Sequence, residues 1–248
     1  MIQMKSLLIE GRYDSLVNQL IRKCVSVIKN SFEATKDGDG KYMGRKISFT
    51  QNETVPDIYQ HEECTLYQEE VENAEIPLEF VFEFRLMWIQ GLGGVDCDGN
   101  AYNDGGYDSD EIPLVEALLQ IDPDTFPGSM NEVIAELSDT IRHELEHLTQ
   151  SGWNMKASKY IPSDKKKRHR IETGKDAIYN YYLLDKEMPA MIHGLYNKAK
   201  KSRRPFADVV DDQMKKLIRQ GVATPEQTEI IKDKWRSILP KLAIRQEI

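Results

Sequence analysis

Hydrophobic residues recur at every third or fourth position between Met130 and Gln150, which is the spacing of one face of an α-helix. The stripe consists of Ile134, Leu137, Ile141, Leu145 and Leu148. No proline or glycine interrupts this stretch. We therefore expect one helix here, with Leu145 and the rest of the stripe packed against a core.

A second pattern, strict alternation, marks residues 78–90 as the strongest strand of the chain. One face of that strand is apolar and largely aromatic, and we expect helices to pack on it; it consists of Leu78, Phe80, Phe82, Phe84, Leu86 and Trp88. Residues 47–50 predict a shorter strand. The apolar run at 112–121 fits either a strand or a short helix, because Pro113 obscures where it begins.

Helical spacing appears again near both ends of the chain. It predicts a helix over residues 14–32, and then helices over 188–200, 206–220 and 225–239. Thr224, Pro225 and Gln227 form a capping sequence at the start of the last of these helices.

Together these elements predict an α+β fold with a small, mostly antiparallel sheet packed on the helix at 130–150. We expect two lobes within one catalytic domain: residues 1–152 with the sheet and that helix, and residues 153–248, which are helical. A cleft should lie between the lobes.

Composition and charge narrow the class of protein. The chain has 248 residues, of which 30% are charged and 40% hydrophobic, as in ordinary globular proteins. Its net charge of −8 argues against general nucleic-acid binding. No apolar run approaches the ~18 residues of a membrane span, and the N-terminal segment is unlike a secretory signal. Three widely separated cysteines predict neither a disulfide framework nor a zinc ribbon, and they favour a reducing compartment such as a cytoplasm.

The helix at 130–150 also carries the motif H-E-x-x-H, at His143, Glu144 and His147. Residues four apart lie one turn apart on the same helix face, so the two histidines can offer two imidazole nitrogens to one ion. Glu144 lies about 100° round the helix from His143, where a carboxylate can hold a metal-bound water without ligating the metal. With five histidines, the motif should arise by chance in roughly one of a hundred such chains, and the periodic helix around it favours a zinc site.

The H-E-x-x-H motif does not identify the third metal ligand. Catalytic zinc usually takes three protein ligands and keeps a fourth position for water. The longer motif H-E-x-x-H-x-x-G-x-x-H fails, because Gln150 and Trp153 stand where glycine and histidine are needed. His169 lies in a basic run, where neighbouring cations disfavour another cation. His193 and Glu187 remain as candidates.

The chain resembles the gluzincin class of zinc metallopeptidases, most closely the small single-domain members from phages and bacteria, over about residues 129–200. The matching residues are His143, Glu144 and His147, followed by Glu187 in the sequence Glu-x-x-Ala. The resemblance implies a zincin-like fold, Zn²⁺ as cofactor with Glu187 as third ligand, Glu144 as general base, and a peptide or protein substrate.

Further details follow from the same resemblance. Ala190, one turn after the ligand, would let the two helices approach closely. A recognisable substrate-strand motif and an aspartate three or four residues after Glu187, both present in larger members, are missing from this chain. For a phage-encoded protein the location would be the host cytoplasm or the virion.

Two polar segments of the chain each allow more than one interpretation. The basic run at 165–170, KKKRHR, is interpreted as a solvated loop, or as a contact for an anion or an acidic substrate. The Gly- and Asp-rich segment 91–110 suggests calcium, but Ala101 and Tyr107 occupy EF-hand positions that require glycine and glutamate. A solvated hairpin loop is the preferred interpretation there.

The leading hypothesis is a zinc-dependent peptidase in which an oxyanion donor is still to be identified; Tyr179, Tyr181, Tyr182 and His193 are candidates, although such a tyrosine cluster also fits core packing. One rival is a non-enzymatic virion or interaction protein that keeps the fold. Another is a DNA-associated peptidase that uses the basic run, which the acidic balance disfavours. Neither a membrane nor a nucleic-acid partner is expected.

Overall fold

The computed structural model describes residues 2–36, 46–48, 61–66, 78–102, 114–149 and 162–242, together with 244, 246 and 248. Its strands are β1 (Lys46–Ser48), β2 (His61–Leu66), β3 (Leu78–Trp88), β4 (Val95–Tyr102) and β5 (Leu114–Ile121). Its helices are α1 (Ile2–Lys36), α2 (Met130–Thr149), α3 (Pro162–Glu172), α4 (Glu187–Ser202), α5 (Phe206–Arg219) and α6 (Pro225–Ile238), with 3₁₀ turns η3 (Ile178–Leu183) and η4 (Leu239–Leu242). Gln150, Trp153 and Tyr107 lie outside the described residues.

The strands form one mixed sheet in the order β1-β3-β5-β4, and β2 also pairs with β3. β3 and β5 are parallel, while the pairings of β1 and β2 with β3 and of β4 with β5 are antiparallel. The predicted strand at 78–90 is confirmed. The described part of the ambiguous run at 112–121 is a strand, β5, and every second residue of β5 is buried, as a half-covered strand requires.

The expectation of a solvated hairpin loop over residues 91–110 is wrong for its first half. Residues 95–102 form β4, whose register sets Val95 opposite Ile121 and Tyr102 opposite Leu114. Hydrogen bonding to β5 therefore overrides the low strand propensity of the Asp, Gly and Asn residues in this segment. β4 is an edge strand among the described residues, where exposed charges such as Asp96 are typical.

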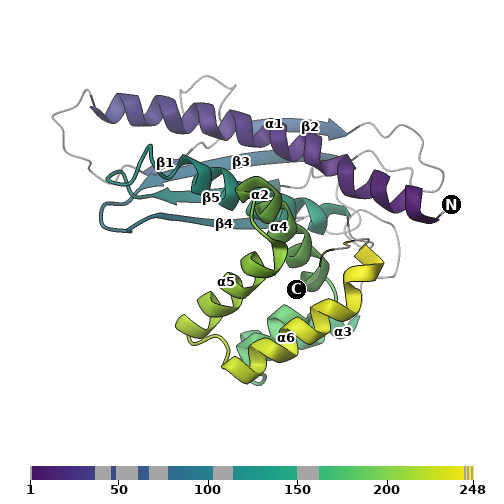
Figure 1. The fold of residues 1–248 in the computed structure, drawn as a ribbon. Coiled ribbons are helices and arrows are strands. Elements are labelled where there is room, and N and C mark those ends of the chain that lie inside the picture. The colour runs from purple at the N-terminus through teal and green to yellow at the C-terminus, as the bar shows by residue number, and fades with distance from the viewer. Residues whose placement is uncertain are drawn as a thin grey trace.

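Helices α1 and α2 cover one face of the sheet (Figure 1). The first hydrophobic core lies between them and the sheet, and it includes Leu20, Ile28, Phe84, Leu86, Trp88, Leu119, Ile141 and Leu145. The described side chains of the apolar face of β3, which are Phe82, Phe84, Leu86 and Trp88, are buried as predicted, and so is Leu145, which is 0% exposed. This arrangement confirms the α+β class. α1 begins at Ile2 rather than near residue 14, because a lone Gly11 weakens a helix without ending it.

The C-terminal helices form a second core of their own. Met188 and Ile192 of α4, Phe206 and Leu217 of α5, and Trp235 of α6 are among its buried members. The predicted start of α6 is confirmed: the hydroxyl of Thr224 and the side chain of Gln227 form a reciprocal capping box, and Pro225 is the first helical residue. Gly221, with a φ of 69°, ends the preceding helix.

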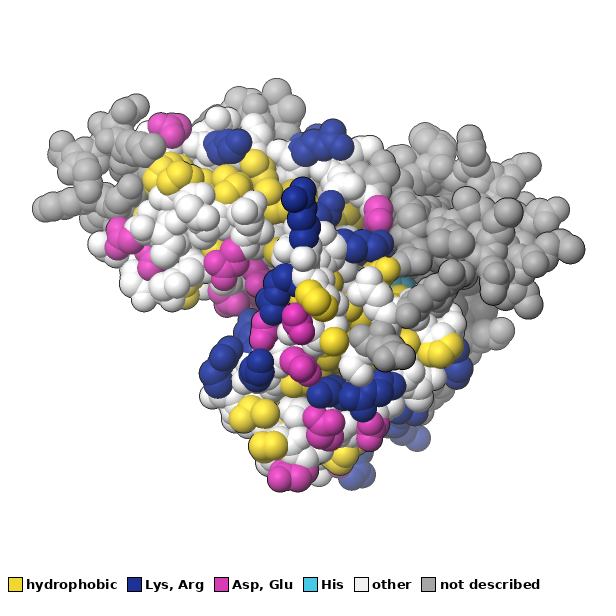
Figure 2. Space-filling model, in the orientation of Figure 1, with side chains coloured by type: hydrophobic (Ala, Val, Ile, Leu, Met, Phe, Trp, Pro, Cys, Tyr) yellow, Lys and Arg dark blue, Asp and Glu magenta, His cyan; other side chains and the backbone are white. Residues whose placement is uncertain are grey.

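Acidic and basic side chains are interspersed over the C-terminal helices on the face shown in Figure 2. A mixed surface of this kind is ordinary for a globular protein. In the part of the chain that the structure describes, no helix has the length and apolar character needed to cross a membrane.

Candidate metal centre

The burial of one face of α2 sets the direction of its two histidines. Ile141 and Leu145 are fully buried in the first core, and this anchors the helix. His143 and His147 lie at the edge of that face and are only partly buried. Their Nε2 atoms are 3.1 Å apart, so the two imidazoles present nitrogens to one point.

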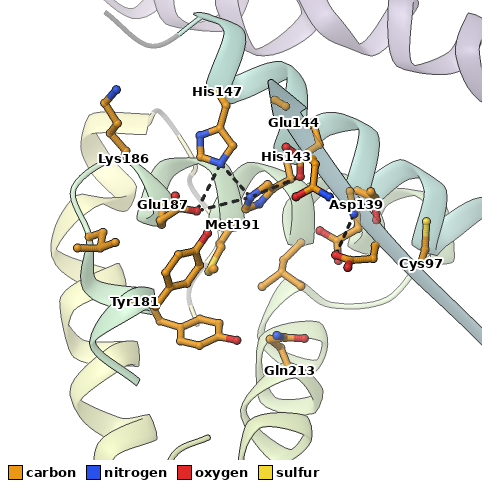
Figure 3. Close-up of a pocket in the computed structure, with 18 of the residues that line it drawn as sticks. Cys97, Asp139, His143, Glu144, His147, Tyr181, Lys186, Glu187, Met191 and Gln213 are labelled. Atoms are coloured by element: carbon orange, nitrogen blue, oxygen red, sulfur yellow. Dashed lines mark hydrogen bonds and ion pairs between the residues drawn. The ribbon is translucent and has the colours of Figure 1, made fainter. Parts of the chain in front are cut away.

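Glu187, the first residue of α4, meets these histidines from the other side. It is 1% exposed, so it is not the solvated helix-start glutamate that its position in the sequence also allowed. Its Oε2 atom lies 3.4 Å from Nε2 of His147 and 3.8 Å from Nε2 of His143. Figure 3 shows the three side chains pointing toward one another.

The close crossing of α2 and α4 makes this meeting possible. Ala190 is fully buried one turn after Glu187, and Gly194 follows a turn later. A Cβ atom at position 194 would lie 2.9 Å from the carbonyl oxygen of Asp139 on α2. Only a residue without a side chain therefore permits this backbone approach.

The spacing of the three donors fits a tetrahedral ion. With metal–nitrogen bonds of about 2.0–2.1 Å, two ligand atoms of a tetrahedral zinc site lie about 3.3 Å apart. The separations of 3.1, 3.4 and 3.8 Å in the structure are near this value. Oε2 of Glu187 is buried and accepts no hydrogen bond from the described residues, as expected of an atom whose partner is a cation.

The protonation states also suit metal binding. Burial, helped by the neighbouring His147, lowers the pKa of His143 to about 4, so its imidazole is neutral near pH 7. Burial pushes the pKa of Glu187 upward, but the contact with His147, the charges of both histidines and the Arg168 guanidinium together lower it to about 2. A neutral imidazole and an ionised carboxylate are the forms that bind a metal.

Glu144 forms, together with His143 and His147, a group of potential metal ligands whose donor atoms lie within 4.8 Å of one another. Its Oε1 atom is 3.9 Å from Nε2 of His143, whereas Oε2 of Glu187 lies within 3.8 Å of the Nε2 atoms of both histidines. Glu144 is 6% exposed. Its pKa is raised to about 8, first by burial, against the opposing effect of His147, and further by the carboxylates of Glu187 and Asp98. It is therefore suited to hold or release a proton near neutral pH.

β4 passes directly over Glu144 because of one glycine. A Cβ atom at Gly99 would lie 2.5 Å from Cγ2 of Thr140 and 2.9 Å from both Cγ and Oε1 of Glu144. Any side chain at this position would push the strand away from α2. The sequence interpretation of this segment as a loop missed Gly99, because its role depends on contacts made only in the folded chain.

A pocket of about 400 Å³ opens between α2, β4, η3 and α4, and the candidate metal donors lie in its wall. Residues 97–101 of β4 line one side, and Tyr181 and Tyr182 of η3 line the other. Tyr181 points toward the histidines and Glu187 (Figure 3). Tyr179 does not line this pocket; it packs against the second core instead.

Arg168 is a residue of the site that sequence reasoning did not single out. It comes from α3, donates a hydrogen bond to Oε1 of Glu187, and places its Nη2 atom 3.3 Å from the hydroxyl of Tyr181. Its guanidinium carbon lies 5.4 Å from the centre of the Tyr181 ring. The only signal in the sequence was its place in the basic run.

The other two histidines named as alternatives lie elsewhere. His169 is exposed on α3. Nδ1 of His193 lies 2.8 Å from Oε2 of Glu146 and 3.2 Å from Nη2 of Arg142, and His193 is not part of the pocket wall. It therefore links α4 to α2 beside the candidate metal centre.

Comparison of the chain with protein-family models, with curated proteins and with solved structures finds no match. The chemistry of the site is therefore inferred from its own donor atoms and their surroundings.

Proposed function

We propose that this protein is a zinc-dependent peptidase of zincin-like architecture. The observation that carries the proposal is the convergence of two imidazoles and one buried carboxylate, from His143, His147 and Glu187, beside the buried acid Glu144 at a pocket. Three protein donors leave one position for water, which distinguishes catalytic from structural zinc. Two imidazoles and a carboxylate are also a donor set that zinc accepts readily.

The chain's own residues supply the remaining chemistry. When bound, Zn²⁺ would act as a Lewis acid on the scissile carbonyl and lower the pKa of the attacking water. The charge of the bound cation would lower the pKa of Glu144 and ionise its carboxyl group. Glu144 would then take a proton from the attacking water and later give it to the leaving amine, as a general base and then a general acid. The hydroxyl of Tyr181 would donate a hydrogen bond to the carbonyl oxygen as negative charge develops there. Its pKa is raised, chiefly by burial, so the phenol stays protonated.

The outer edge of β4 supports a peptide as the substrate. Within the described residues β4 pairs only with β5, and its residues 97–101 line the pocket beside Glu144. An edge strand can add an extended peptide through main-chain hydrogen bonds. A peptide bound in this way would pass its carbonyl groups across the metal donors.

The direct test is to measure the zinc content of protein purified without added metal and the cleavage of a mixed peptide library by the same preparation. We expect about one zinc per chain and cleavage that a chelator abolishes. Zinc with no cleavage of any peptide would favour the rival, a non-enzymatic virion or interaction protein that keeps the fold. Absence of zinc and of cleavage would reject the proposal.

A further inference from the structure

The basic run at 165–170 is not the solvated loop that its composition suggested. It lies on α3, an eleven-residue helix. The residues of α3 include five Lys or Arg against Asp164 and Glu172, a net charge of +3. Because the whole chain carries −8, the rest of it carries −11. α3 is therefore a concentrated positive element on an acidic protein.

Hydrophobic packing does not explain this helix. Residues 166–170 are all exposed, and Ile171 is only partly buried. Two polar contacts join α3 to the beginning of α4 beside the candidate metal centre. Asp164 accepts a hydrogen bond of 3.1 Å from the backbone N–H of Lys186, next to Glu187, and Arg168 pairs with Glu187 itself.

The pocket and α3 share a boundary. Asp164 and Arg168, one turn apart, face the pocket and form part of its wall, together with Lys186. Lys167 lies beside them, with its Nζ atom 3.8 Å from Oδ1 of Asp164. Arg168 thus lies in the pocket wall, and the exposed Lys166 and Lys167 precede it along α3.

We propose that α3 is a docking surface for an acidic segment of the peptide substrate, which Arg168, Lys167 and Lys166 hold beside the candidate metal centre. That the docked peptide is also a substrate rests on the proposed peptidase function, whereas the docking itself can be measured without turnover. Charge complementarity provides the selection. Acidic peptides would be attracted to α3, while the net negative charge of the rest of the chain would disfavour their binding elsewhere.

An acidic peptide fits these observations better than a nucleic acid. Among residues 166–170, α3 exposes a single aromatic ring, the imidazole of His169, whereas single-strand binders stack successive bases on several rings. The positive charge of α3 extends over only eleven residues, and it ends at a pocket lined by a strand edge suited to an extended peptide. Nucleic-acid binding without base contacts would instead need many phosphate contacts along a longer track.

The test compares two short labelled peptides with the same centre, one flanked by Asp and Glu and the other by Ser and Gly. Binding is measured by fluorescence anisotropy and cleavage by product formation, both with the full-length zinc-loaded protein. The variant Lys166→Gln/Lys167→Gln removes two charges from α3 without adding a carboxylate near Asp164. The control Lys234→Gln/Lys241→Gln removes two exposed charges from α6 and η4. A DNA oligonucleotide of matched negative charge is tested beside the peptides.

We expect wild type and the control to bind the acidic peptide about tenfold more tightly than the neutral one at low salt. In the α3 variant the ratio should fall by roughly threefold or more, and high salt should reduce it in all three proteins. Equal binding of the two peptides, or equal ratios in the α3 variant and the control, would overturn the docking proposal. Cleavage of either peptide in that case would leave the peptidase proposal intact.

Two other outcomes separate the proposals further. An α3-dependent preference for the acidic peptide without cleavage would keep the docking surface and reject the peptidase. Tighter α3-dependent binding of the oligonucleotide than of the acidic peptide would overturn the proposal in favour of a nucleic-acid contact.

Discussion

At the scale of single residues, Glu187 is the side chain that contacts both histidines of the site and Arg168. A carboxylate that is 1% exposed is costly to ionise unless other groups compensate its charge. Here Arg168 binds one oxygen, and the second oxygen faces His143 and His147. The Arg168 contact therefore fixes which oxygen is presented to the histidines. It should also weaken the carboxylate as a donor and so make a bound ion a stronger Lewis acid.

Replacing Glu187 tests this arrangement. We predict that Glu187→Ala loses most of the bound zinc, because it removes one of three donors and leaves Arg168 beside the site. His193→Ala is the control, since His193 contacts Glu146 and Arg142 and does not line the pocket. Metal analysis after purification measures both. Retained zinc in Glu187→Ala, with loss in His193→Ala, would move the third ligand to His193.

The residues of the site were accessible from the sequence to different degrees. His143 and His147 could be paired because helix geometry fixes residues four apart, and Glu144 followed from the same geometry. Glu187 was reached only through a family resemblance, since 40 residues separate it from His147 and only tertiary packing joins them. Arg168 and Gly99 were missed because their local sequences are those of ordinary charged or turn segments.

At the scale of secondary-structure elements, the contact between α2 and α4 decides the geometry of the donors. α2 carries His143 and His147, whereas α4 carries Glu187. Gly194 sets how closely the two helices approach. His143 also lies at this crossing, since its Cβ atom would be 3.4 Å from a Cβ at position 194. The donor distances should therefore respond to a change that touches no donor.

We predict that Gly194→Ala lowers the free energy of unfolding by about 1–3 kcal/mol, because overpacking outweighs the better helix propensity of alanine. Its zinc affinity should also fall. Denaturant unfolding and a competition titration with a chelating dye measure the two effects. Unchanged affinity together with a stability equal to wild type would show that the crossing tolerates a side chain.

Elements were predicted well where local pattern and tertiary environment agree. β3, α2 and α6 carry regular periodicity or a capping sequence, and the structure has them at the expected positions. β4 was missed because its residues favour loops, and its pairing with β5 comes from a distant segment. α3 was missed because charge runs are usually solvated; it is solvated, but it is helical.

At the scale of the whole molecule, the candidate metal donors lie on two helices that pack into separate hydrophobic cores. α2 contributes Ile141 and Leu145 to the first core and carries His143 and His147. α4 contributes Met188 and Ile192 to the second core and carries Glu187. A bound metal would thus join the sheet-containing part of the molecule to the helical part, in addition to any catalytic role.

Removing the metal should therefore destabilise the protein. An ion present at a hundred times its Kd stabilises the folded state by about 2.7 kcal/mol, which for a chain of this size corresponds to roughly 5–10 °C in Tm. We predict a drop of this order when a chelator is added, and recovery when zinc is restored. Glu187→Ala should show no such dependence. An unchanged Tm on removal of stoichiometric zinc would mean that the ion does not join the two cores.

The most direct test of the central claim compares the variant Glu144→Gln with wild type. Zinc content and peptide cleavage are measured on the same sample of each protein. Glutamine keeps the size of the side chain but cannot accept the proton. Because Glu144 is proposed to contact the water and not the metal, zinc content and fold should be unchanged, while turnover falls by about 10²-fold or more. Equal cleavage by Glu144→Gln and wild type at equal zinc content would contradict the proposed mechanism.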